Sequence, residues 1–266
     1  MEASTDPRSW TVLVTIAPHK YFVEKIAGDT VKTLVLLPVG ANAHTFDPTP
    51  KQVFAASGAD LWFKLGEPFE GQTLAALKSH NSRLQPVELS KDIELLSGHC
   101  SHHKHCSSSD LHYWLSPKAA KIQAKTITDA LIRQYPENGK VYTNNYNAFI
   151  KELDELDSQV AIILNPLNSR TFFVSHPAYA YFGKDYNLHQ ISIEFEGKDP
   201  SPKQLTKILD KARELQVKTI FLQPQFSNKG AKVVAELIGA KGVMLDPFEE
   251  NYPKMILDIA TKISQK

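Results

Sequence analysis

The chain has 266 residues, of which 42% are hydrophobic and 22% charged, and its formal net charge is +1. This length exceeds what one ordinary core needs, so two domains are expected. The near-neutral balance argues against a nucleic-acid partner, and no apolar run approaches the roughly 18 residues of a membrane-spanning helix. Residues 1–9 lack the basic and apolar parts of a signal peptide, so an exported protein would have lost its targeting segment.

Short runs rich in Val, Ile, Leu and Phe alternate with helical patterns along the chain. They predict buried parallel strands at residues 11–16, 31–37, 61–65, 171–174, 218–222 and 242–245. Alternating strands and helices on both sides of the middle favour an α/β protein. We expect two lobes, each with a central parallel sheet flanked by helices.

Three segments place a polar capping residue directly before a proline. They are Thr49-Pro50, Ser116-Pro117 and Ser201-Pro202. The polar side chain can accept from the first backbone N–H groups of a helix, and proline presets the backbone angle of its first turn. A helix is therefore predicted to begin at each of these three prolines.

Residues 136–166 carry apolar side chains at helical spacing and have no glycine after Gly139. They predict one amphipathic helix of about 40 Å, long and rigid enough to join the two lobes. The alternative is a helix that belongs to one domain, with the boundary elsewhere. The predicted organisation is an N-terminal lobe at 10–136 with a His-rich loop at 97–109, a linking helix at 137–165 and a C-terminal lobe at 166–266.

The ten histidines fall into groups with different expected roles. Four lie in the His-rich loop, whereas His44, His112 and His176 stand apart near predicted strand ends. Asp246 directly follows another predicted strand. Ligands of α/β sheets bind beyond the carboxyl ends of the strands, so these side chains could gather around a metal in a cleft between the lobes. Each histidine alone could instead be structural, and Asp246 could cap a turn before Pro247.

Five motifs in order resemble the metal-binding solute-binding proteins of ABC transporters, in their ZnuA-like zinc branch (cluster A-I). They are VGANAHTFDPTP (39–50), DLHYWLSP (110–117), SHPAYAYF (175–182), EGKDPSPKQL (196–205) and LDP (245–247). The resemblance implies metal bound between two lobes for delivery to a membrane permease. It also implies that His44, His112 and His176 are the imidazole ligands and that Asp246 lies near the fourth position.

Two positions depart from the family pattern, and a third position, His176, indicates the metal. Ala43 stands where relatives have proline, and Gln223-Pro224 stands where they often have Glu-Pro, so position 223 receives no metal role. In the manganese and iron branch of the family that this chain resembles, the position of His176 is occupied by a glutamate. Three neutral histidines suit zinc better than manganese. Zn²⁺ is therefore the predicted ion.

The His-rich loop could bind further zinc weakly or be inert. Its histidines are His99, His102, His103 and His105. Cys100 and Cys106 in the same loop leave a disulfide, two thiols or metal ligation open.

The predicted function is an extracytoplasmic, periplasmic zinc-binding protein that delivers the ion to an ABC-transporter permease. We expect a monomer that neither binds nucleic acid nor spans a membrane, and no enzymatic activity. Two alternatives remain: a manganese or iron carrier of the same fold, and a zinc-dependent hydrolase. The sequence shows no HExxH motif, which counts against the hydrolase.

Overall fold

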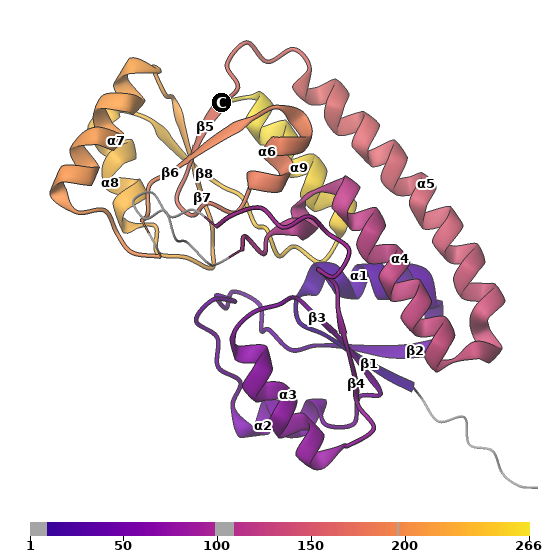
Figure 1. The fold of residues 1–266 in the computed structure, drawn as a ribbon. Coiled ribbons are helices and arrows are strands. Elements are labelled where there is room, and N and C mark those ends of the chain that lie inside the picture. The colour runs from indigo at the N-terminus through magenta and orange to yellow at the C-terminus, as the bar shows by residue number, and fades with distance from the viewer. Residues whose placement is uncertain (1–9, 99–108, 196) are drawn as a thin grey trace, which may run out of the picture. The chain divides into compact units, whose positions relative to one another are not determined.

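The computed structural model describes residues 10–98, 109–195 and 197–266. The chain divides into two compact units. The first contains the described residues up to Asp92 together with Lys121–Glu152, and the second contains those of Ile93–Ala120 together with Leu153–Lys266. The ribbon is drawn in Figure 1.

The first unit is built on a four-stranded parallel sheet in the order β2-β1-β3-β4. Its strands are β1 (Trp10–Val14), β2 (Val31–Val35), β3 (Leu61–Lys64) and β4 (Gln85–Glu88). The helices α1 (Ala17–Ala27), α2 (Pro50–Ala56) and α3 (Phe69–His80) follow β1, β2 and β3. Leu13 and Trp62 of the sheet pack with Ala56 of α2 and Leu77 of α3, so these two helices bury one face of the sheet.

The second unit repeats this arrangement with the sheet order β6-β5-β7-β8, again all parallel. Its strands are β5 (Thr171–Val174), β6 (His189–Ser192), β7 (Thr219–Leu222) and β8 (Lys241–Met244). Its helices are α6 (Ala180–Tyr186), α7 (Pro202–Glu214), α8 (Lys229–Ile238) and α9 (Tyr252–Ser264). Phe173 and Ile220 of the sheet form a core with Ile208 of α7 and Val234 of α8. The two parallel sheets with flanking helices confirm the predicted fold class.

All three predicted helix starts are confirmed. At α2 the Thr49 side chain accepts from the Gln52 backbone, and the Gln52 side chain accepts from the Thr49 backbone. The same reciprocal box joins Ser201 and Gln204 at the start of α7. The third helix, α4 (Pro117–Gln134), begins where the Ser116 hydroxyl accepts from the Ala119 N–H at 3.0 Å. Each cap satisfies a backbone donor that the first helical turn leaves without a partner.

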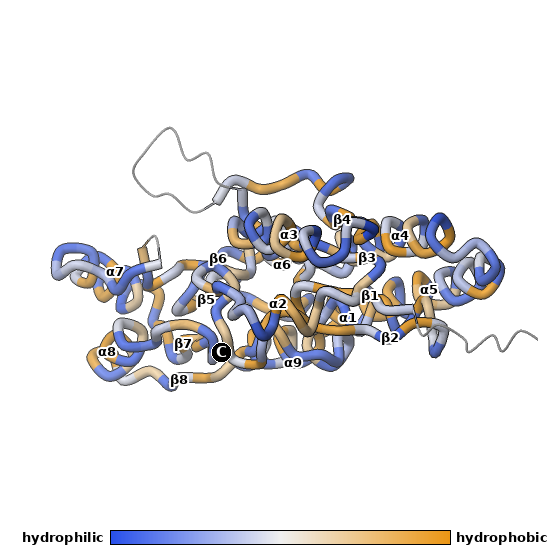
Figure 2. Tube along the Cα trace, turned by 90° about the horizontal axis from the view of Figure 1, so that it is seen from below, coloured by the Kyte–Doolittle hydropathy of each residue, from blue (hydrophilic) through white to orange (hydrophobic). Residues whose placement is uncertain are grey.

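The predicted long helix is also confirmed, as α5 (Gly139–Leu164), which has 26 residues and a length of about 39 Å. Its buried side chains recur at three- or four-residue spacing at Phe149, Leu153, Leu156 and Val160. Figure 2 shows the matching alternation of hydrophobic and hydrophilic residues along the helix. The division between the two units passes through α5 after Glu152, so one continuous helix supplies residues to both.

The described residues of 93–98 and 109–120 group with the second unit, whereas the sequence pattern assigned them to the first lobe. The Trp114 indole donates to Pro247 O at 2.8 Å, and the Tyr181 hydroxyl donates to Asp110 O at 2.8 Å. These contacts join segments far apart in the sequence, which periodicity cannot reveal. The predicted boundaries at 136 and 165 stay a prediction.

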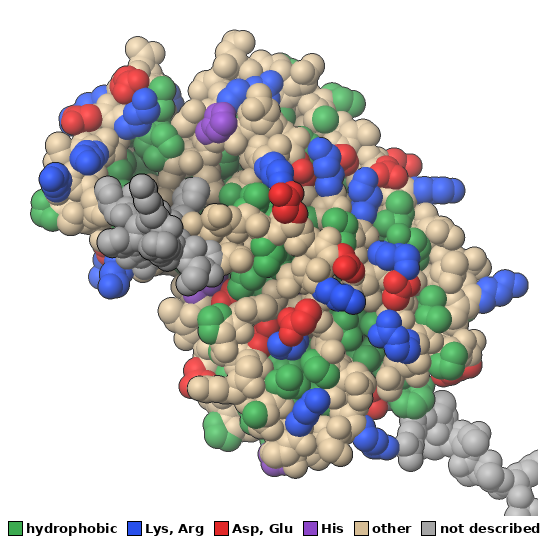
Figure 3. Space-filling view, in the orientation of Figure 1, with side chains coloured by type: hydrophobic (Ala, Val, Ile, Leu, Met, Phe, Trp, Pro, Cys, Tyr) green, Lys and Arg blue, Asp and Glu red, His purple; other side chains and the backbone are tan. Residues whose placement is uncertain are grey.

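The described surface is mixed in charge, as the composition suggests. Figure 3 shows acidic and basic side chains interspersed on the visible face. No described helix combines the length and the apolar character needed to cross a membrane. The short bridge between Ser97 and Ser109 lies at the ends of the predicted His-rich loop. The four histidines and two cysteines of that loop lie outside the described residues.

Candidate metal centre

His176 follows β5 in the second unit and is 6% exposed. Its Nδ1 lies 2.6 Å from Glu194 Oε1, and its ring stacks on Phe226 with centroids 3.7 Å apart. Since a carboxylate accepts hydrogen bonds, Nδ1 donates and Nε2 keeps its lone pair. Glu194 and Phe226 therefore fix both the tautomer and the plane of the imidazole.

His112 lies in the same unit, directly before a short 3₁₀ turn at Tyr113–Leu115, and is 5% exposed. Asp110 Oδ1 accepts from the His112 backbone N–H at 2.8 Å and lies 2.7 Å from His112 Nδ1. The Trp114 ring packs beside the imidazole, with centroids 5.2 Å apart. One carboxylate oxygen thus orients both the main chain and the side chain of His112.

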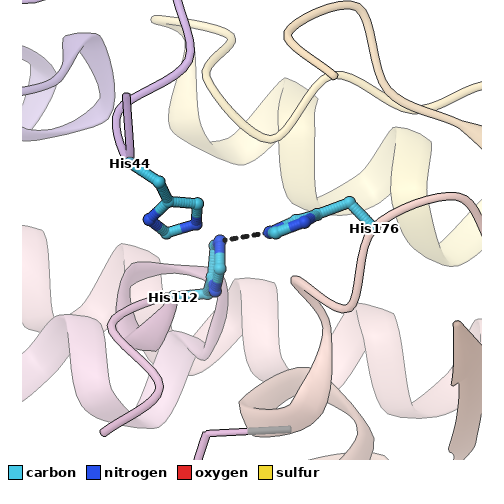
Figure 4. Close-up of side chains that lie close together, drawn as sticks. All are labelled: His44, His112 and His176. Carbon is cyan, nitrogen blue, oxygen red and sulfur yellow. Dashed lines mark hydrogen bonds between the residues drawn. The ribbon is translucent and has the colours of Figure 1, made fainter. Parts of the chain in front are cut away.

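The two buried histidines of the second unit point toward one another. Their Nε2 atoms lie 3.2 Å apart, as the dashed line in Figure 4 marks. If both rings are neutral and both Nδ1 atoms donate to carboxylates, the two Nε2 atoms have no proton between them and turn their lone pairs to this gap. Such an arrangement is stabilised by a cation or a shared proton between the nitrogens, so the pair has the chemistry of a metal site.

His44, also drawn in Figure 4, lies in the first unit on the loop between β2 and α2. Its backbone N–H donates to Asn42 Oδ1 at 2.9 Å, and its Nδ1 lies 3.0 Å from Glu67 Oε1. The His44 side chain is 35% exposed, whereas that of Glu67 is only 2% exposed. A buried carboxylate therefore orients the imidazole while much of its ring stays accessible.

The segment that carries Glu67 is itself held by Glu70. Glu70 accepts hydrogen bonds from the Thr15 hydroxyl and from the N–H groups of Leu65, at 2.9 Å, and Gly66, at 2.7 Å. Burial raises the pKa of the Glu70 carboxyl, and these hydrogen bonds act in the opposite direction. The bonds connect β1 to the β3–α3 segment and so fix the place from which Glu67 reaches His44.

Asp246 follows β8 in the second unit and is half-buried. Its Oδ1 accepts from Gln225 Nε2 at 2.7 Å and from the Phe248 N–H at 2.9 Å. The second bond makes Asp246 the cap of a turn, as the structural interpretation of LDP predicts. A role as a fourth ligand stays a prediction.

His19 is a buried histidine that belongs to none of the groups described above. It is fully buried in the first unit, and its Nε2 lies 2.9 Å from Gln123 Oε1. Burial lowers the pKa of His19 to about 3, and the hydrogen bond that His19 donates to Gln123 opposes this shift. This imidazole is therefore neutral at physiological pH.

Sequence reasoning missed the side chains that orient the three histidines: Glu67, Asp110, Glu194, Gln223 and Phe226. Asp110 carried a local signal, because Asp-x-His places a carboxylate within reach of the following imidazole. Glu67 and Glu194 lie 23 and 18 residues from their partners, and only the fold brings them near. Gln223 had been set aside because it departs from the family pattern.

A family model described as the periplasmic component A of the zinc-uptake complex, ZnuA, matches residues 12–266. A metal-binding protein of Chlamydia muridarum is 32% identical over 257 residues, which cover 96% of this chain and 91% of that protein. The high-affinity zinc uptake system protein ZnuA of Bacillus subtilis is 32% identical over 249 residues, covering 90% of this chain and 78% of that protein.

Solved structures are similar in fold as well as in sequence. A crystal structure of ZnuA matches with a TM-score of 0.91 and 37% identity, covering 97% of this chain and 98% of that one. A ZnuA deletion mutant with zinc bound matches with a TM-score of 0.90 and 37% identity, covering 96% of this chain and 97% of that one. The likeness extends over both units.

Proposed function

The chain belongs to the ZnuA family of periplasmic zinc-uptake components, and we propose that it binds one Zn²⁺ tightly through His44, His112 and His176. The ion is then delivered to the membrane permease of an ABC transporter. The protein acts outside the cytoplasm as a monomer. It is a carrier, so the ion is its cargo and no catalytic step is involved.

The observation that carries this proposal is the pair of buried imidazoles in the second unit. Two nitrogens bound to one tetrahedral zinc, with bonds near 2.0–2.1 Å, are separated by about 3.3 Å. The Nε2 atoms of His112 and His176 lie 3.2 Å apart, and carboxylates beside both Nδ1 atoms leave the two Nε2 atoms for the metal. The pair therefore has the spacing and the tautomers that a zinc ion needs.

His44 is proposed as the third ligand because its Nδ1, like those of the pair, lies beside a carboxylate oxygen, and because it lies in the first family motif. Glu67 holds its Nδ1, so Nε2 is the nitrogen available to a metal. Three imidazoles suit zinc, cobalt, nickel or copper and disfavour manganese. Asp246 or water would complete the coordination.

Metal titration of the purified, metal-free protein tests this function. We expect one tight zinc equivalent that excess manganese does not displace. Any additional weak equivalents are assigned to His99, His102, His103 and His105. Ester and peptide substrates should not be hydrolysed by the zinc-loaded protein. Displacement of zinc by equimolar manganese would contradict the zinc assignment, and metal-dependent turnover would contradict the carrier.

A further inference from the structure

The turn between β7 and α8, residues 223–228, contacts both ligands that the sequence predicts in the C-terminal half. Its sequence is QPQFSN, and the family resemblance assigned it no metal role. Gln223 and Phe226 contact His176, and Gln225 contacts Asp246. All of these residues lie in the second unit. Two ligand positions 70 residues apart in the chain are thus held from one short turn.

The Gln223 side chain forms hydrogen bonds with both backbone polar groups of His176. Its Oε1 accepts from the His176 N–H at 2.9 Å and from the Ser175 hydroxyl, while its Nε2 donates to His176 O at 2.7 Å. The side chain is fully buried. Only an amide supplies an acceptor and a donor in this geometry, because an ionised carboxylate has no proton to give to His176 O. The amide of Gln223 meets this requirement, whereas an ionised glutamate would meet only its acceptor half.

The same turn also supports the imidazole ring and Asp246. The Phe226 ring lies nearly parallel to the His176 ring, at an interplanar angle of 10°. Gln225 is 8% exposed, and its Nε2 donates to Asp246 Oδ1 at 2.7 Å. One bond therefore fixes an oxygen of Asp246, while a stacked ring limits rotation of His176.

Asn228 fastens the turn that carries these contacts. Its Oδ1 accepts from the Gln223 N–H at 3.2 Å, and its Nδ2 donates to Gln223 O at 2.8 Å and to Phe226 O at 3.1 Å. Such side-chain bonds to the main chain replace the ladder bonds that end with β7. Gln223 and Phe226 are thus held in a fixed relation to each other.

We infer that the turn at residues 223–228 is a positioning element that sets His176 and Asp246 for zinc in advance of binding. Gln223 is the positioning residue for His176, and Gln225 is the one for Asp246. The inference rests on the proposed zinc site. Side chains that orient metal ligands typically change affinity 10- to 100-fold when they are removed, because the ligand must then be ordered by the metal itself.

Zinc affinity, measured by competition with a chelator, tests the inference on the full chain. Gln223→Met keeps the size of the side chain but removes its hydrogen bonds, and should weaken zinc binding about 10- to 100-fold. Gln223→Glu keeps the acceptor for His176 N–H and should lose less. Gln225→Met should lose less still, about threefold, because water can replace Asp246. Ser227→Ala, at an exposed position of the same turn, is the matched control and should bind as the wild type does.

Two further measurements separate positioning from a general loss of structure. The visible spectrum of the Co²⁺-loaded protein should change with Gln223→Met but not with Ser227→Ala. Gln223→Met should cause no further loss of affinity in a His176→Ala background, and Gln225→Met none in an Asp246→Ala background. Should Gln223→Met fail to fold, the Gln223→Glu variant serves for the same comparison.

The possible failures are distinguishable. Wild-type zinc affinity in His176→Ala would overturn the proposed zinc site itself. A weakened His176→Ala together with wild-type affinity and an unchanged cobalt spectrum in both Gln223 variants would overturn the positioning role alone. Additive losses in the double variants would likewise contradict it, because Gln223 would then act on something other than His176.

Discussion

The two units share one strand order but present their predicted ligands differently. In the second unit the side chains of His112 and His176 are each 7% exposed, and each contacts both a carboxylate and an aromatic ring. In the first unit the His44 side chain is 35% exposed and lies on a loop. The same sheet topology therefore supports both a rigid ligand pair and an accessible ligand, depending on burial at the strand ends.

This difference in burial determines whether each histidine side chain loses its conformational entropy on folding or on metal binding. A buried, hydrogen-bonded side chain loses its rotamer freedom when the protein folds, whereas an exposed one loses it when the metal binds. In the proposed zinc site, the pair in the second unit would therefore lose little side-chain entropy on binding, and His44 would lose more. Substitutions of the histidines and of their carboxylate partners should therefore change zinc affinity to different extents in the two units.

Removal of the histidines should have the largest effect. We expect His112→Ala and His176→Ala to weaken zinc binding by more than about 100-fold, because each leaves a single imidazole of the prepared pair. His44→Ala should cost at least tenfold but less than either of these, since water can take the place of an exposed ligand. Calorimetric titration with zinc measures all three.

The far-ultraviolet circular dichroism of each alanine variant serves as the folding control and should match the wild type. Equal losses in all three variants would mean that the difference in burial between the units has no consequence for affinity. A larger loss for His44→Ala than for the pair would reverse the comparison.

Replacement of the orienting carboxylates should have an intermediate effect and sharpen the contrast. Glu194→Gln keeps the size of the side chain but replaces a strong acceptor of the His176 Nδ1–H by a neutral amide, so we expect about a tenfold loss of zinc affinity. Glu67→Gln should cost less, about threefold, because the His44 ring it orients is more exposed to water than the rings of the pair. Chelator competition at fixed pH measures both.

Glu249→Gln is a suitable control for these substitutions. Glu249 forms an exposed ion pair with Lys254 at 2.9 Å, and removal of such a pair changes stability little. A loss of zinc affinity in this control equal to that of Glu194→Gln would show that overall charge, and not orientation of His176, determines the effect.

The sequence predicted the elements of the fold wherever burial leaves a pattern. The runs at 61–65 and 171–174 became β3 and β5, whose Trp62 and Phe173 are fully buried. The strands β4 and β6 were missed. Each is a four-residue edge strand, β4 contains Pro86, and β6 has the sequence HQIS. Half-exposed edges need few apolar residues, so composition does not distinguish them from loops.

The residues of the candidate site likewise include some that the sequence predicted and some that it did not. His44, His112 and His176 were found from their place after strands and from family motifs, both of which are local in the sequence. Their partners Glu67 and Glu194 were not found, because tertiary packing alone joins them to the histidines. The sequence therefore predicts candidate metal ligands more readily than it predicts the residues that orient them.

The smallest effect on zinc affinity is expected from His19, a buried histidine of the first unit that is not a proposed ligand, although it should affect stability at low pH. Its pKa is about 3 in the folded protein, because burial disfavours the charged ring, compared with about 6.5 in an unfolded chain. Between these values the unfolded state binds the proton and the folded state does not. The unfolding free energy should therefore be unaffected above pH 6.5 and fall below it, by up to about 1.4 kcal/mol per pH unit.

Urea unfolding of the metal-free protein at pH 7 and pH 5 measures this contribution. His19→Gln cannot be protonated and can still donate to Gln123, so it should lose less stability between the two pH values than the wild type does. The exposed His189→Gln serves as the matched control and should show the wild-type slope. Zinc affinity at pH 7 should be unchanged in His19→Gln, because His19 is neutral there and its hydrogen bond is kept. An identical loss of stability in wild type and His19→Gln would mean that acid destabilisation arises elsewhere.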